Sequence, residues 1–166
     1  MTPSELLIDS FERVREGALA AIDGLSEEQL AHRVAPDANS IAWLVWHAYR
    51  VQDEHLADAA GLQQVWAARG FIEHFDLDID EDDTGYGHTS TQVGKVRAPA
   101  ELLARYVEAV HKQTLAWVGG LSAEGLDRVV DTSWDPPVTL GVRVVSVIND
   151  DTQHIGQAAY VRGLLD

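Results

Sequence analysis

Four long segments place apolar residues three or four positions apart, and this helical spacing is the feature that most constrains the fold. The segments begin near Pro3, Ser40, Pro99 and Thr139. No segment shows the apolar–polar alternation that is typical of a half-buried strand. We therefore predict an all-α protein built as a four-helix bundle.

A short internal repeat sets the order of these helices. "GLSEEQLAHRV" at 24–34 and "GLSAEGLDRVV" at 120–130 match at one constant offset, and each copy lies between two long helical segments. The chain is thus predicted to be one domain, 1–166, of two helix–turn–helix halves. The stretch 61–98 between them has a weaker pattern and contains the polar run "DLDIDEDDTGYGHTS", so we expect a long middle crossover.

Composition excludes several classes of function. The formal net charge of −15 argues against nucleic acid and anionic membranes as partners, because both require a basic surface. The chain has no cysteine, which rules out a thiolate nucleophile or a cysteine metal site of its own. We find neither a signal-peptide pattern nor an apolar run of membrane-spanning length, and we expect a soluble, cytoplasmic protein that could pair as a homodimer.

Polar residues on two helices form a candidate metal site. Asp150 and His154 are four positions apart and so share one face of the last helix, while His47 lies on the apolar stripe of the second. Carboxylate and histidine ligands from facing helices suit a divalent metal, with zinc favoured and nickel a second candidate. Three ligands would leave a tetrahedral metal one open position, as in catalytic zinc sites. A satisfied core histidine and an exposed Asp–His pair remain the alternatives.

Five further residues are candidates for the surroundings of this site. Gln157 lies one helical turn beyond the histidine and could orient a ligand. Arg143 falls on the same helical stripe and could bind an anionic group. Tyr86 and His88 occupy a glycine-flanked loop and could border a pocket, and Asp151 is the nearest unassigned carboxylate. For Arg143, and for Tyr86 and His88, a solvated surface position remains the alternative. Two other histidines are expected at the surface or at the edge of the core, His55 and His111.

Three stretches of the sequence resemble one protein family. "WDPPVTLGVRVVSVINDDTQHIGQAAYVRGLL" resembles the C-terminal signature of the DinB-like superfamily and is most similar to its mycothiol S-transferase-like branch. "TGYGHTSTQVGKVRAPAELLARY" and "IAWLVWHAYRVQDEHL" resemble the middle segment and second helix of that branch. In the related mycothiol-dependent maleylpyruvate isomerases the metal ligands are a second-helix histidine and a Glu-x-x-x-His pair. The resemblance carries these roles to His47, Asp150 and His154, with the shorter aspartate in place of glutamate.

The resemblance also implies an activity. It predicts a metal-dependent S-transferase that uses a low-molecular-weight thiol, mycothiol in the first place, on an electrophilic small molecule. Two alternatives remain open at this point. One is a metal-dependent hydrolase with a metal-activated water, in which Asp151 would be the general base. The other is a non-catalytic bundle whose helices mediate oligomerisation.

Overall fold

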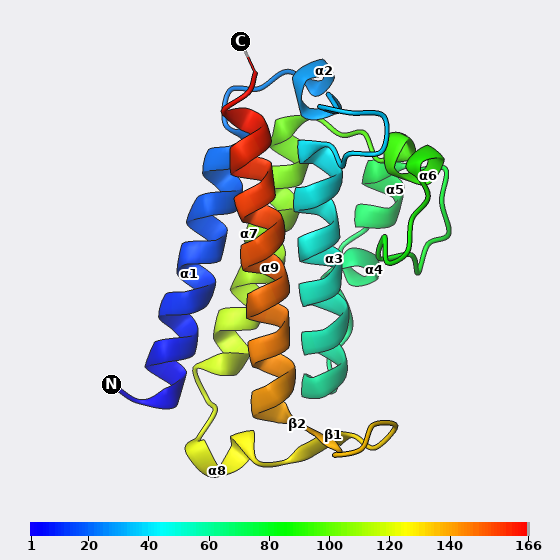
Figure 1. The fold of residues 1–166 in the computed structure, drawn as a ribbon. Helices are drawn as coiled ribbons and strands as arrows, with labels where there is room; N and C mark the ends of the chain where they lie inside the picture. The colour runs from blue at the N-terminus through cyan, green and yellow to red at the C-terminus, as the bar shows by residue number, and fades with distance from the viewer. Residues whose placement is uncertain (166) are drawn as a thin grey trace.

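Four long helices lie side by side in a computed structural model that describes residues 1–165 (Figure 1). They are α1 (Pro3–Ile22), α3 (Ile41–Ala60), α7 (Ala100–Val118) and α9 (Leu140–Arg162). The predicted all-α four-helix bundle is confirmed. Among these residues no helix has both the length and the hydropathy that a membrane span requires.

The helices begin where the sequence supplies capping side chains. Thr2 and Glu5 form a capping box at the start of α1, each side chain accepting a hydrogen bond from the other residue's backbone amide. The side chains of Ser40 and Thr139 each accept a hydrogen bond from the backbone amide three positions further on. These local contacts explain why three of the four helix starts could be predicted from the sequence.

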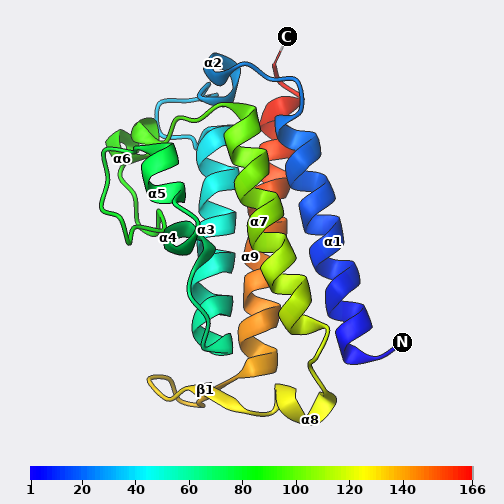
Figure 2. The ribbon, with the colours of Figure 1, turned by 180° about the vertical axis from the view of Figure 1, so that it is seen from behind.

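The path of the chain makes the long crossover necessary. α1 and α9 run in one direction and α3 and α7 in the other, so the chain must return along the bundle between α3 and α7 (Figures 1 and 2). Three short helices occupy this return and lie beside α3: α4 (Val65–Ala68), α5 (Phe71–Phe75) and α6 (Ser90–Lys95). α1 and α3 each pack against both α7 and α9. The repeated segments form two matching short helices, α2 (Glu27–Leu30) and α8 (Ala123–Leu126).

One part of the second half departs from the prediction. Two short strands, β1 (Val129–Asp131) and β2 (Val138–Thr139), pair antiparallel between α8 and α9. The expectation that the chain contains no strand was therefore wrong at this point. Segments of three and two residues are too short to show alternation, and their pairing depends on the turn that joins them. The first half has no such hairpin in the structure, so the internal repeat ends after the short helix.

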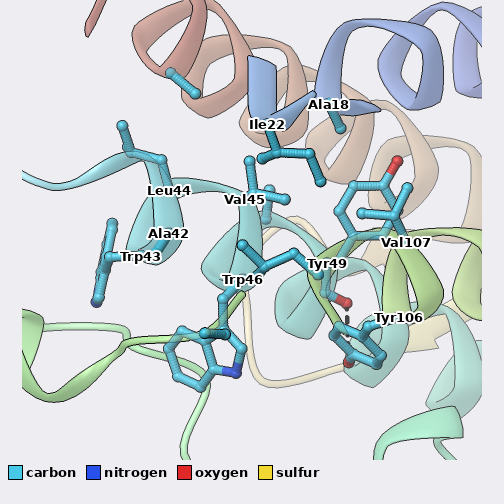
Figure 3. Packing of buried hydrophobic residues seen from close by; sticks show 14 of the residues in the cluster. Ala18, Ile22, Ala42, Trp43, Leu44, Val45, Trp46, Tyr49, Tyr106 and Val107 are labelled. Carbon is cyan, nitrogen blue, oxygen red and sulfur yellow. Dashed lines mark hydrogen bonds between the residues drawn. The ribbon is translucent and has the colours of Figure 1, made fainter. Parts of the chain in front are cut away.

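α3 is buried on nearly every side, and this decides where a site can form. All ten residues from Ile41 to Arg50 are buried. Val45 and Tyr49 point toward Ile22 and the other bundle helices, whereas the Trp46 ring points the other way, toward the crossover (Figure 3). The crossover thus covers the face of α3 that the bundle leaves open.

Candidate metal centre and its pocket

Three potential metal ligands meet where α3 packs against α9. His47 comes from α3, and Asp150 and His154 come from successive turns of α9. Each offers one donor atom, and no two of these atoms are more than 4.8 Å apart. His154 Nε2 lies 3.6 Å from Asp150 Oδ1. Tetrahedral zinc, with bonds of about 2.1 Å, needs donors about 3.4 Å apart, so modest side-chain adjustments would close the site around an ion.

The surroundings of His47 prepare it to act as a ligand. Its Nδ1 is hydrogen bonded to the backbone carbonyl of Thr84, so Nδ1 carries the hydrogen and Nε2 has a free lone pair. Its ring is 5 % exposed and stacks on Trp43, with 4.5 Å between ring centroids. Burial lowers the pKa of His47, the Thr84 bond opposes this, and the neighbouring His154 lowers it further. The imidazole is therefore neutral near pH 7, as metal binding requires.

Two buried atoms of the cluster lack a hydrogen-bond partner among residues 1–165. They are Asp150 Oδ2 and His154 Nδ1. Buried polar atoms without partners are costly, and an unpaired carboxylate oxygen beside two imidazoles is the kind of donor that a divalent cation would satisfy. The residues present fit a metal ion, as the sequence pattern predicted.

A cavity of about 560 Å³ is lined by two of the three candidate ligands, His47 and Asp150, whereas His154 lies outside the lining. Four segments line it: α3 (His47, Val51, Glu54, His55), the crossover (Thr84, Tyr86), the β1–β2 connection (Trp134) and α9 (Arg143, Ser146, Val147, Asp150). Tyr86 and Trp134 are largely exposed, at 90 % and 67 % of their surface. The cavity can hold a small molecule in contact with both His47 and Asp150 and with two exposed aromatic rings.

The structure places Arg143 and Tyr86 in this pocket, where the sequence analysis expected them. The Arg143 guanidinium donates to Asp131 Oδ2 at 2.9 Å, and its Nη1 lies 3.2 Å from Nδ1 of His55. His55 was expected to be exposed but is half-buried here. Burial lowers its pKa, and the Arg143 charge lowers it further. Arg143 thus ties the β-hairpin to the wall of the pocket.

Three other predicted residues do not line the pocket, namely Gln157, His88 and Asp151. Gln157 is exposed on α9, does not line the cavity and makes no side-chain hydrogen bond within residues 1–165. The His88 ring is buried behind the pocket wall, where it binds Asp83 and Trp43. Asp151 is absent from the lining, although it follows Asp150 directly.

Asp151 shows why neighbours on one helix can have different environments. Successive residues point about 100° apart around an α-helix, so Asp150 faces the pocket while Asp151 turns into the bundle. Its carboxyl group is fully buried and neither oxygen has a hydrogen-bond partner among the described residues. Burial raises its pKa well above the usual range, and the nearby Asp150 charge raises it further. A carboxyl group in this position cannot act as a base toward a molecule in the pocket.

The pocket also contains residues that the sequence analysis did not assign to a site. Val51, Glu54 and His55 follow His47 at four, seven and eight positions, which is the helical spacing of one face. That spacing could have identified them. Trp134 carries no comparable signal, because only the fold of the hairpin brings it to the pocket.

Comparisons with known proteins agree with this fold and site. A sequence model of the mycothiol-S-transferase family matches residues 6–166. A crystal structure of a conserved protein from Enterococcus faecalis superposes with a TM-score of 0.91 at 30 % sequence identity, covering 98 % of this chain and 96 % of the other. A search of curated proteins found no match. The chain therefore belongs to the mycothiol-S-transferase family, a branch of the DinB-like helical bundles.

Proposed function

We propose that the protein is a metal-dependent thiol S-transferase that joins a low-molecular-weight thiol, mycothiol in the first place, to an electrophilic small molecule. The observation that carries this proposal is the cluster of His47, Asp150 and His154, two of which line a cavity, in a chain of this family. The chain has no cysteine, so the sulfur must come from a second molecule.

The chain's own residues would divide the work between holding the metal and holding the reactants. His47, Asp150 and His154 would supply three ligands and leave one position toward the cavity. A bound divalent cation lowers the pKa of a coordinated thiol, which makes a thiolate nucleophile available near pH 7. Trp134 and Tyr86 would cover the outer part of the reactants, and the pocket walls would hold the two reacting groups together.

The charges of the pocket favour an uncharged thiol. Arg143 is the one arginine of the described lining, and the Asp131 carboxylate already pairs with it. Glu54 and Asp150 add two further carboxylates to the lining. No surplus positive side chain remains for a carboxylate of the thiol, and the net charge of the whole chain repels anions. Mycothiol, a neutral sugar thiol, suits this pocket better than an anionic thiol such as glutathione.

The hydrolase alternative loses the base that the sequence suggested. Asp151 faces the interior of the bundle and does not line the cavity. A metal-bound water could still form at the open position, so the test must separate transfer from hydrolysis.

The test measures metal content and thiol-dependent turnover in the same preparations. We would reconstitute untagged protein with zinc, add mycothiol and 1-chloro-2,4-dinitrobenzene, and follow loss of the chloride and formation of the thioether. His154→Ala should lose both metal and activity. His32→Ala removes an exposed histidine outside the cluster and should keep both.

The outcomes separate the three functions. Equal metal content in wild type and His154→Ala would contradict the metal site. Turnover of an ester substrate without any thiol would favour the hydrolase. Full metal binding with neither reaction, over a panel of thiols and electrophiles, would favour a bundle without this chemistry.

A further inference from the structure

We propose that the crossover segment 83–88 positions His47 as a metal ligand, and that Asp83 and His88 are positioning residues of the metal centre. Neither residue lines the pocket or belongs to the metal cluster. The proposal rests on the metal site of the proposed function but does not depend on thiol transfer. Its basis is a closed ring of contacts that leaves α3 at Trp43 and returns to it at His47, one helical turn further on.

The first part of the ring is the contact between the segment and His47. The Thr84 carbonyl accepts the hydrogen bond from His47 Nδ1. Gly85 follows with φ of 91°, and a Cβ added there would lie 2.9 Å from His47 Nδ1. The backbone therefore lies directly against the imidazole. Glycine is required at this position because φ is positive and because a Cβ would have no space.

The Asp83 carboxylate holds this piece of backbone in place. Its Oδ1 accepts a hydrogen bond from the Gly85 amide at 2.7 Å, and its Oδ2 lies 2.8 Å from His88 Nε2. Burial alone would raise the pKa of Asp83, but the bonds from His88 and Gly85 hold it below the usual value. The carboxylate thus stays ionised and ties the Gly85 amide, which directly follows the Thr84 carbonyl, to the His88 ring.

The tautomer of His88 follows from its second hydrogen-bond partner, Trp43. Trp43 Nε1 lies 3.0 Å from His88 Nδ1, and an indole nitrogen can only donate. His88 Nδ1 must therefore accept, which leaves the hydrogen on Nε2 to be donated to Asp83. Trp43 also stacks on the His47 ring. The residue that sets the tautomer of His88 is therefore the one that covers the face of the metal ligand His47.

A buried arginine anchors the segment from the other side. Arg50 is fully buried and its Nε donates to the Asp83 carbonyl at 3.2 Å. The same side chain donates to Gln64 at 3.0 Å and lies over the Trp66 ring. Trp66 Nε1 in turn donates to the Glu81 carbonyl at 2.9 Å. These contacts fix the position of the segment, and the Asp83–His88 pair fixes its conformation at Thr84.

The function of this ring is to hold His47 in one tautomer and one orientation. A histidine that donates from Nδ1 to a fixed carbonyl keeps its ring in one orientation. Its Nε2 therefore already points toward the metal before the metal binds. Loss of such outer contacts in metal sites weakens metal binding by roughly 10- to 100-fold. We expect that range for Asp83→Ala and His88→Leu, although both variants retain all three proposed ligands.

The main experiment is zinc affinity by competition with a chromophoric chelator, using the full chain. His88→Gln should keep affinity near the wild-type value, because its amide can accept from Trp43 and donate to Asp83. Asp78→Asn is the matched control, since it removes the charge of an ion pair of the same crossover, that of Asp78 with Lys95, which does not reach His47. Cobalt(II) spectra of each variant would report whether the ligand geometry has changed.

A second measurement applies to the metal-free protein and separates this proposal from the proposed function. Long-range ¹H–¹⁵N spectra of the histidine side chains should show His47 protonated at Nδ1 and His88 at Nε2 in the wild type. Asp83→Ala should convert His47 to a mixture of tautomers while circular dichroism still shows a folded bundle. Wild-type zinc affinity in Asp83→Ala, an equal loss in Asp78→Asn, or an unchanged His47 tautomer would each overturn the proposal.

Discussion

Replacing Gly85 by alanine tests how closely the crossover is packed on the metal ligand. An added Cβ would lie 2.9 Å from His47 Nδ1 and from Trp46 Cζ3, both in buried rings. Gly87 provides a matched control. It also has positive φ, at 74°, but an added Cβ there would meet no atom within 4 Å. Gly87→Ala therefore shares the backbone strain and lacks the collision.

The expected cost follows from these two terms. Positive φ costs an L-residue about 1–2 kcal/mol, and this applies to both variants. Overpacking against buried rings adds about 1–3 kcal/mol to Gly85→Ala alone. In a chain of this length 1 kcal/mol corresponds to about 2–4 °C in melting temperature. With an excess of about 2 kcal/mol, Gly85→Ala should melt about 4–8 °C below Gly87→Ala.

Circular dichroism melts in excess chelator measure this difference without a contribution from metal. Zinc affinity of the same samples is the second readout, because only Gly85→Ala displaces the His47 ring from its place beside the Thr84 carbonyl. Equal melting temperatures for the two variants would show that the rings move aside at little cost. Unchanged zinc affinity in Gly85→Ala would show that the ligand does not depend on this contact.

Three further predictions concern the buried charge, the pocket and pH. Asp53→Ala should lower the free energy of unfolding by about 3–5 kcal/mol in denaturant titrations, because it leaves the buried Arg50 without its carboxylate partner; a loss below about 1 kcal/mol would contradict this. Glu54→Gln removes a negative charge from the pocket lining, so it should lower KM for the anionic glutathione and leave KM for mycothiol nearly unchanged in the thiol-dependent turnover assay. An equal change for both thiols would argue against selection by charge. Burial lowers the pKa of His47 and His55, so the unfolded chain binds more protons below about pH 6.5 and the metal-free protein loses stability as pH falls through that value. Chelator-treated melts at about pH 7.5 and about pH 5.5 should show a smaller loss in His55→Gln than in wild type, and an identical loss would remove His55 from the explanation.

The buried network around Arg50 shows what a sequence pattern leaves undetected. Arg50 and Asp53 stand in a helical run that also contains apolar residues, and by composition they could belong to a solvated face. In the structure Asp53 accepts hydrogen bonds from the backbone amides of Val65 and Trp66 at 2.8 and 2.7 Å. Those partners belong to the crossover, whose packing on α3 no local pattern encodes. The burial of both charges therefore depends on a contact between distant parts of the chain.

The metal cluster was predictable in part, for a related reason. Asp150 and His154 share a face because they are four positions apart on one helix, and this follows from helix geometry alone. Spacing alone could not show which of Asp150 and Asp151 lines a pocket, or that His55 lines the same pocket as His47. The four-residue spacing to His154 and the apolar stripe of the second helix suggested Asp150 and His47, and the resemblance to known relatives pointed to the same residues. The packing of α3 on α9 brings one donor atom of each of the three residues within 4.8 Å of the other two.

The sequence by itself determined the features that depend on neighbours a few positions apart. These are the four helices, their capped starts, the repeated short helices and the i, i+4 ligand pair, all set by backbone hydrogen bonding and helical period. Only the tertiary structure decided which face of each helix meets a partner. In the folded chain Asp151 is buried, His88 lies behind the pocket wall and Trp134 lines the pocket. The Thr84 carbonyl accepts a hydrogen bond from His47. The physical reason is that burial and hydrogen-bond partners at these positions come from segments tens of residues away, so they exist only once the crossover and the hairpin have packed against the bundle.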